Sequence, residues 1–223
     1  MKKLLTTLAG LSLTAVSFAG PSPDQVEITD LAVGGPGCPQ GTTDFLITST
    51  TPGGPADFFE VVFDSFLVEK GPGVSRTQKR KHCTIAAQVH FPQGYSFSLM
   101  EVHYEGWAEL PIGSRGILKS EYFFPFYSNR VSIRKELQGP FEDDYDKNDT
   151  LGVFNSVWSP CGREVPLNIK STLELRGPQD DPAVMSVDLT TGLLTQKWAL
   201  SWRKCTEDEM RDARDRQSPI VIQ

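Results

Sequence analysis

The residues of this 223-residue chain best suited to chemistry begin with a histidine between two acids. His103 stands two positions from Glu101 and two from Glu105 in an alternating segment. Side chains two apart lie on the same face of a β-strand, so these three are expected side by side. A histidine between carboxylates can ligate a metal or transfer protons, although an ordinary solvent-facing strand has the same pattern. We interpret this row as a candidate binding surface.

Trp107 extends the row. It has the parity of Glu105 and opposes that of Tyr104 and Ala108, which are expected in the core. The other aromatic candidates include Trp198, which alternates with apolar residues and is predicted to be buried. Trp107 is therefore predicted to be the exposed aromatic of a binding site.

A second acidic run suggests calcium. Asp144, Asp146 and Asn148 have the alternate spacing of oxygen ligands in a calcium loop. The sixth position is Asp149 rather than glycine and the twelfth is Asn155 rather than glutamate, so the run is no EF-hand. We predict either a looser calcium site of Asp144, Asp146, Asn148 and Asp149 in an acidic loop, or a solvated turn. No other cofactor is expected.

The chain has four cysteines, and their spacings exclude the common zinc motifs. An even number in an exported chain predicts disulfides, for which three pairings are possible. We choose the sequential pairing, Cys38–Cys83 and Cys161–Cys205. Each bridge closes a loop of about 45 residues and contributes ~4 kcal/mol in the chain-entropy model.

Catalytic motifs are missing from the sequence. There is no GxSxG elbow and no HExxH zinc motif. A carboxylate pair for glycoside hydrolysis leaves no local signature, because its members come from distant strands. The formal net charge of −6 argues against nucleic acid and anionic membranes as partners.

The elements that must position these residues follow an apparent secretory signal. Residues 1–19 have a basic start, an apolar run and small residues before position 20, as in a signal peptide. The apolar run is too short to span a bilayer, and no later stretch is long enough. The protein is expected to be secreted: extracellular, or periplasmic or at the cell surface in a bacterium.

The clearest structural pattern lies at residues 83–110. Alternation from Cys83 to Phe91 and again from Tyr95 predicts two strands around a three-residue turn, Pro92 to Gly94. We interpret them as a hairpin in which Val89 faces Phe97. The parity of the apolar residues reverses after Leu99, which predicts a β-bulge near Leu99–Met100.

Similar segments separated by Gly/Pro turns bring the total to about ten strands. The sequence thus predicts an all-β fold, an antiparallel β-sandwich forming a single domain over residues 20–205. Residues 206–223 form a charged tail, either a short helix or disordered. Thr206 and Glu209 have the spacing of a capping box at its start.

Several short motifs occur in a familiar order: Gly-Cys-Pro (37–39), His-Cys (82–83), Phe-Pro-Gln-Gly-Tyr (91–95), Ser-Pro-Cys-Gly (159–162), Leu-Asn-Ile (167–169) and Trp-Arg-Lys-Cys (202–205). With all four cysteines, this set resembles the secreted bacterial and fungal proteins grouped as domain of unknown function 4360, over residues 24–205. The resemblance implies export, two disulfides and a β-rich domain. It implies no catalytic residue.

These observations favour a non-catalytic binding, surface or structural protein over an enzyme. The expected partner is an extracellular polymer or protein. The alternative is an extracellular hydrolase acting on glycan or protein.

Overall fold

A computed structural model describes residues 20–125, 127–150, 157–162, 164–187 and 195–217. The signal peptide predicted at residues 1–19 and the end of the predicted tail, 218–223, lie outside the described residues. Twelve strands, one 3₁₀ turn and one α-helix occur in the described part. They are η1 (Pro23–Gln25), β1 (Glu27–Gly34), β2 (Thr43–Thr48), β3 (Phe58–Phe63), β4 (Leu67–Lys70), β5 (Arg80–His90), β6 (Tyr95–Leu110), β7 (Arg115–Phe123), β8 (Val131–Gln138), β9 (Phe141–Thr150), β10 (Glu164–Arg176), β11 (Ala183–Ser186), β12 (Thr195–Lys204) and α1 (Glu207–Gln217).

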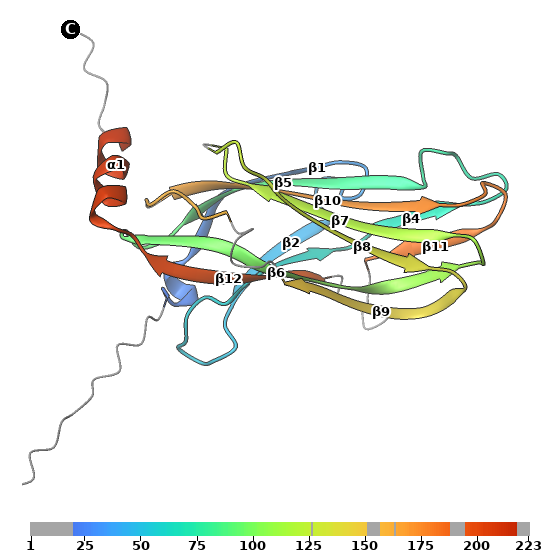
Figure 1. Ribbon diagram of the computed structural model, residues 1–223, viewed down its shortest axis with the longest axis horizontal. Coiled ribbons are helices and arrows are strands. Elements are labelled where there is room, and N and C mark those ends of the chain that lie inside the picture. Colours follow the sequence, from blue (N-terminus) through green and yellow to red (C-terminus); the bar gives the residue numbers. More distant parts are fainter. Residues whose placement is uncertain (1–19, 126, 151–156, 163, 188–194, 218–223) are drawn as a thin grey trace, which may run out of the picture.

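The strands form two antiparallel sheets stacked face to face, as predicted for a sandwich (Figure 1). Sheet A has the order β1-β5-β10-β7-β8. Sheet B has the order β2-β3-β12-β6-β11-β4, and β9 pairs with β6 outside this path. Alternation along each strand places one set of side chains in the shared core and the other on an outer face.

The predicted hairpin at residues 83–110 is wrong. β5 pairs with β1 and β10 in sheet A, whereas β6 pairs with β12, β9 and β11 in sheet B. The turn carries the chain from one sheet to the other, and Gly94 supplies its left-handed residue with φ +90°. Inward-facing apolar side chains meet across the core in a sandwich, as Phe91 and Phe97 do edge to face at 5.4 Å. The alternation is the same in a hairpin and in a corner between sheets, so it does not distinguish them.

The predicted bulge in β6 is confirmed. Leu200 of β12 pairs with Leu99, but the preceding residue, Ala199, pairs with Glu101. Met100 is the extra residue. The bulge resets the parity of β6, so that Glu101, His103 and the alternate residues after them lie on the outer face.

A buried polar bridge joins the two sheets. The amide of Gln196, on β12, donates through Nε2 to Ser120 Oγ of β7 at 2.6 Å and accepts from Ser171 Oγ of β10. All three residues are buried. Because each polar group has a partner, the bridge avoids the cost of unsatisfied groups in an apolar core.

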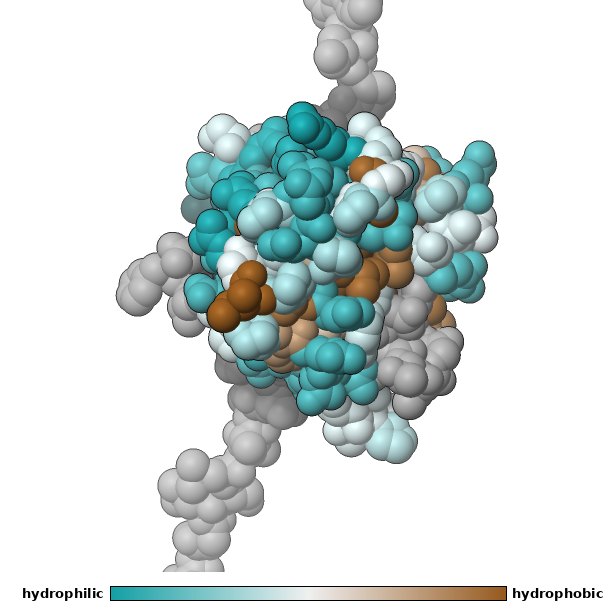
Figure 2. Space-filling view, turned by 90° about the vertical axis from the view of Figure 1, so that its right-hand side faces the viewer, coloured by the Kyte–Doolittle hydropathy of each residue, from teal (hydrophilic) through white to brown (hydrophobic). Residues whose placement is uncertain are grey.

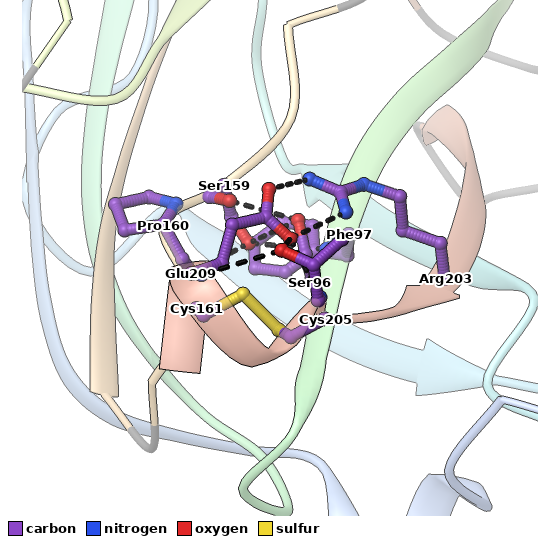
Figure 3. Close-up of a disulfide and its surroundings, with 9 residues drawn as sticks. Ser96, Phe97, Ser159, Pro160, Cys161, Arg203, Cys205 and Glu209 are labelled. Carbon is purple, nitrogen blue, oxygen red and sulfur yellow. Dashed lines mark hydrogen bonds and ion pairs between the residues drawn. A yellow bond between two sulfur atoms is a disulfide. The ribbon is translucent and has the colours of Figure 1, made fainter. Parts of the chain in front are cut away.

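Both predicted disulfides are confirmed, Cys38–Cys83 and Cys161–Cys205. The second bridge ties the segment before β10 to the end of β12, as Figure 3 shows. Ser159 holds that segment along β6, because its amide donates to Phe97 O at 2.8 Å. Its hydroxyl also accepts from Phe97 N at 3.0 Å.

The predicted capping box is confirmed at the start of α1. Glu209 N donates to Thr206 Oγ1 at 3.3 Å, and the Glu209 carboxylate accepts from Thr206 N at 2.9 Å. The same carboxylate holds Arg203 of β12 in a two-point ion pair, at 2.6 and 2.9 Å (Figure 3). The pKa of Glu209 falls to about 2, mainly because of the hydrogen bonds from Arg203. Of the predicted tail, residues 207–217 are therefore a helix fixed to one end of the sandwich.

Candidate functional site

The candidate site is the outer face of β6 and β9, which we call the β6–β9 face. Residues 139–150 were predicted to form an acidic loop, and this is wrong, because Phe141–Thr150 is a strand paired with β6 along its whole length. Strand propensity is low in a run of Asp and Asn. Two inward anchors outweigh it: Phe141 packs against the core, and the buried Tyr145 donates its hydroxyl to Ser186 O.

This strand places the two predicted sites next to each other. The β6–β9 register pairs Glu101 with Thr150, His103 with Asn148, Glu105 with Asp146, Trp107 with Asp144 and Glu109 with Glu142. Residues predicted separately for binding and for calcium thus alternate on neighbouring strands. Opposite residues in an antiparallel pair have Cβ atoms about 5 Å apart, so each pair can interact directly.

His103 is the centre of this face. Its Nε2 lies 2.9 Å from Glu105 Oε1 on its own strand and 3.4 Å from Asp146 Oδ1 on β9. The His103 side chain is 27% exposed and that of Asp146 is 70% exposed. The result is one imidazole nitrogen and two carboxylates within mutual reach, open to solvent on the Asp146 side.

Lysine does not neutralise these carboxylates. Lys197 of β12 pairs directly with His103, but its ammonium lies 2.9 Å from Glu60 and 4.1 Å from the centre of the Phe58 ring. In the described part of the chain, His103 is the sole basic side chain within 4.0 Å of the Glu105 or Asp146 carboxylates. Among the described residues, no lysine or arginine therefore forms an ion pair with Glu105 or Asp146.

The four predicted calcium ligands do not share a face. Asp144, Asp146 and Asn148 lie on the outer face at alternate positions, so neighbours are about 6.7 Å apart along the strand. Asp149 has the opposite parity and forms a 3.1 Å ion pair with Lys135 of β8 across the edge of the sandwich. A calcium site of these four residues stays a prediction, and in this register it would need Asp149 to reach round from the opposite face of β9.

Trp107 is half-buried on β6, between Asp144 on β9 and Ser186 on β11. Trp107 thus lies on the outer face, as its parity predicted, but its side chain is half-buried rather than exposed, and its role in binding stays a prediction. Trp198, predicted to be core, is fully buried. Glu101 lies at the other end of the row from Trp107, opposite Thr150.

Sequence reasoning missed a second acidic pair. Glu109 and Glu142 are both exposed, stand directly opposite each other and line an open pocket of about 350 Å³ with Phe141, Pro111 and Pro182. Figure 2 looks onto this end of the sandwich, opposite α1, where apolar side chains gather within a largely hydrophilic surface. Only the strand register reveals the pair, because its members lie far apart in sequence. The two aromatic residues of equal parity, Phe141 and Tyr145, were the usable signal in the sequence.

The fold and this face together define a disulfide-bonded antiparallel β-sandwich with an acidic outer surface. The chain belongs to the family described as domain of unknown function (DUF4360), whose sequence profile matches residues 24–205. An "uncharacterized secreted protein" of Arthroderma benhamiae is 30% identical over 187 residues, covering 83% of this chain and 74% of that protein. With two disulfides as well, the chain is a secreted protein.

Similar solved structures include a carbohydrate-binding module, TmCBM61 in complex with β-1,4-galactotriose. It has a TM-score of 0.26 and 10% identity, and the match covers 83% of this chain and 95% of that one. The tailspike protein 4 of bacteriophage CBA120 has a TM-score of 0.25 and 11% identity, over 81% of this chain and 20% of that one. Likenesses this weak bear on neither ligand nor activity. No helix among the described residues is long and apolar enough to cross a membrane.

Proposed function

We propose that this protein is a non-catalytic binding protein that holds an extracellular polysaccharide on its β6–β9 face. The observation that carries the proposal is the pairing of Trp107, Glu105 and His103 with Asp144, Asp146 and Asn148. A half-buried aromatic ring thereby lies beside a row of oxygen acceptors that extends roughly 13 Å along the strands.

The side chains of this face suit a sugar ligand. An indole ring offers an apolar surface for stacking. Carboxylates and amides accept hydrogen bonds from hydroxyl groups, and bonds to an ionised acceptor are the stronger kind. The excess of acid repels polyanions, so neutral or amino-bearing sugars are the favoured class.

The test is retention of the purified protein on insoluble chitin, chitosan, cellulose and β-glucan. We expect retention on at least one, and a loss of affinity of about tenfold or more in Trp107→Ala, because truncation of a central aromatic anchor costs ~2 kcal/mol and each 1.4 kcal/mol is about tenfold. Phe123→Ala is the matched control: Phe123 is a half-buried aromatic on the outer face of sheet A, beneath Arg130. Failure of the wild type to bind any of these polymers, or equal losses in both variants, would refute the proposal.

A second candidate is a glycoside hydrolase, favoured by Glu109 and Glu142 in their open pocket. Glu109 and Glu142 are opposite each other in the antiparallel ladder, so their side chains are neighbours at the pocket. Retaining enzymes hold their two carboxyl groups at about 5–5.5 Å from each other, which neighbouring glutamate side chains can reach. Release of reducing ends from the same polymers, abolished in Glu142→Gln, would support it. If the protein binds the polymers but releases no reducing ends, and Glu142→Gln binds as the wild type does, the hydrolase hypothesis is refuted and the binding function stands.

A further inference from the structure

We propose that His103, Glu105 and Asp146 bind a first-row divalent transition metal ion, for which Zn²⁺ is the probe. The site differs from the calcium site that the sequence suggested, because it takes its ligands from two strands rather than from one run. It does not depend on the polysaccharide proposal, although both use the β6–β9 face.

The spacing of the ligand atoms supports the site. Zn²⁺ is held tetrahedrally at about 2.0–2.2 Å from nitrogen and oxygen ligands, which separates the ligand atoms from one another by about 3.3–3.5 Å. His103 Nε2 lies 2.9 Å from Glu105 Oε1 and 3.4 Å from Asp146 Oδ1. All three ligand atoms lie within 4.8 Å of one another, which is close to the spacing that one ion requires.

The chemistry of the donors selects the metal class. Calcium and magnesium take oxygen ligands, whereas imidazole nitrogen favours zinc, copper, nickel or iron. Two carboxylates balance the charge of a divalent ion. Their negative charge is available for this, because Lys197 forms its ion pair with Glu60 instead. Three protein ligands leave one coordination position, on the open side next to Asp146, for water or for an oxygen of a bound ligand.

Metal binding would also fasten β9. This strand lies outside the main strand order of sheet B and pairs with β6 alone. Its outer face carries Asp144, Asp146 and Asn148, residues of low strand propensity. An ion shared by Asp146 and the two β6 ligands would add a side-chain link between β9 and β6.

The experiment is calorimetric titration of the purified, chelator-treated protein with Zn²⁺ and, separately, with Ca²⁺. We expect one Zn²⁺ per chain, at least about tenfold tighter than Ca²⁺, and weakening by about tenfold or more in His103→Gln and in Asp146→Asn. His90→Gln is the matched control, because His90 lies on the outer face of sheet A and, among the described residues, only the Glu164 carboxylate lies within 4.0 Å of its ring, at 3.8 Å from Nδ1. Glu27 also pairs with His90 in the ladder, but its carboxylate lies beyond that distance. The control variant should bind Zn²⁺ as the wild type does.

A second readout is amide hydrogen exchange. Zn²⁺ should slow exchange in β9 of the wild type and leave His103→Gln unchanged. No saturable Zn²⁺ binding, equal affinity for Ca²⁺, or equal losses in His90→Gln and His103→Gln would overturn the proposal. Polysaccharide retention is also measured in EDTA, which removes bound metal. Retention should persist there, because stacking on Trp107 does not need the metal, so the two proposals can fail separately.

Discussion

The outer faces of the two sheets carry charge in different ways. On sheet A, acids and bases alternate in ion pairs. Glu174 meets Arg80 at 3.7 Å and Arg176 at 2.7 Å, and Glu121 meets Lys119 at 3.1 Å. On the β6–β9 face acids stand beside acids, with His103 between two of them and Glu109 opposite Glu142. The same alternating fold thus carries one balanced face and one acidic face.

Folding alone does not require this difference. Both sheets need only an apolar inner face to pack, and surface ion pairs add little stability. Like charges opposite each other on a sheet are destabilising. Such pairs occur on both faces, as Glu109 opposite Glu142 on one and Arg115 opposite Arg176 on the other, so the two faces differ in the sign and balance of their charge.

The largest expected effect on stability comes from a substitution in the core between the two sheets. Gln196→Ala removes the bridge between the sheets, leaves Ser120 and Ser171 without this partner and opens a cavity. We expect a loss of about 2–4 kcal/mol in the free energy of unfolding, measured by denaturant titration. The outer-face control Gln88→Ala should change it by less than about 0.5 kcal/mol. Equal effects would mean that the bridge does not hold the sheets together.

A smaller effect on stability is expected from Glu209, which forms a two-point ion pair with Arg203 where α1 meets the sandwich. The folded pKa of Glu209, about 2, lies below its ordinary value of 4.5, so its ion pair stabilises the fold above pH 4.5. That contribution is lost as the pH falls from 4.5 towards 2. Because the pair is partly exposed, Glu209→Gln should cost less than about 1 kcal/mol at pH 7.

The measurement for Glu209 is thermal unfolding of wild type and Glu209→Gln at several pH values. The gap between the two proteins should close by pH 2. A gap that persists there would show that Glu209 acts through packing or capping rather than through its charge.

The smallest expected effects come from neutralising one glutamate on each outer face. The resulting changes in the free energy of unfolding should have opposite signs. Glu109→Gln removes repulsion from Glu142 and should stabilise the fold by about 0.5 kcal/mol. Glu136→Gln on sheet A removes a carboxylate whose pKa is lowered by its hydrogen bond to Arg134, and it should destabilise the fold slightly. Urea titrations of both variants at low salt give the signs, and 1 M salt should reduce both effects. Two changes of the same sign would remove the proposed difference between the faces.

Much of the fold could be predicted because it depends on period-two alternation. The sandwich and the bulge at Met100 follow from patterns within short segments. Export and an even cysteine count predicted two disulfides, but the pairing was a choice among three, which the structure confirms. Strand pairing could not be predicted in the same way. Val89 and Phe97 are apolar whether they pair in one ladder or meet across the core, so the pattern did not reveal that β5 and β6 lie in different sheets.

The candidate site shows the same limit. His103 with Glu105 was visible as a local row, and Asp146 was visible in an acidic run. Their approach depends on the pairing of β9 with β6. The acidic composition of residues 142–149 hid that strand, because tertiary anchoring by Tyr145 outweighs the low strand propensity of its neighbours.

Hydrogen exchange with and without a bound polysaccharide tests the central claim most directly. The probe is a soluble oligomer of whichever polymer retains the wild type, and the readout is backbone protection across all twelve described strands. We predict slower exchange in β6 and β9, and no change in β7 and β8 of sheet A. Protection confined to sheet A, or to the end of the sandwich next to α1, would contradict the assignment of the β6–β9 face as the binding surface.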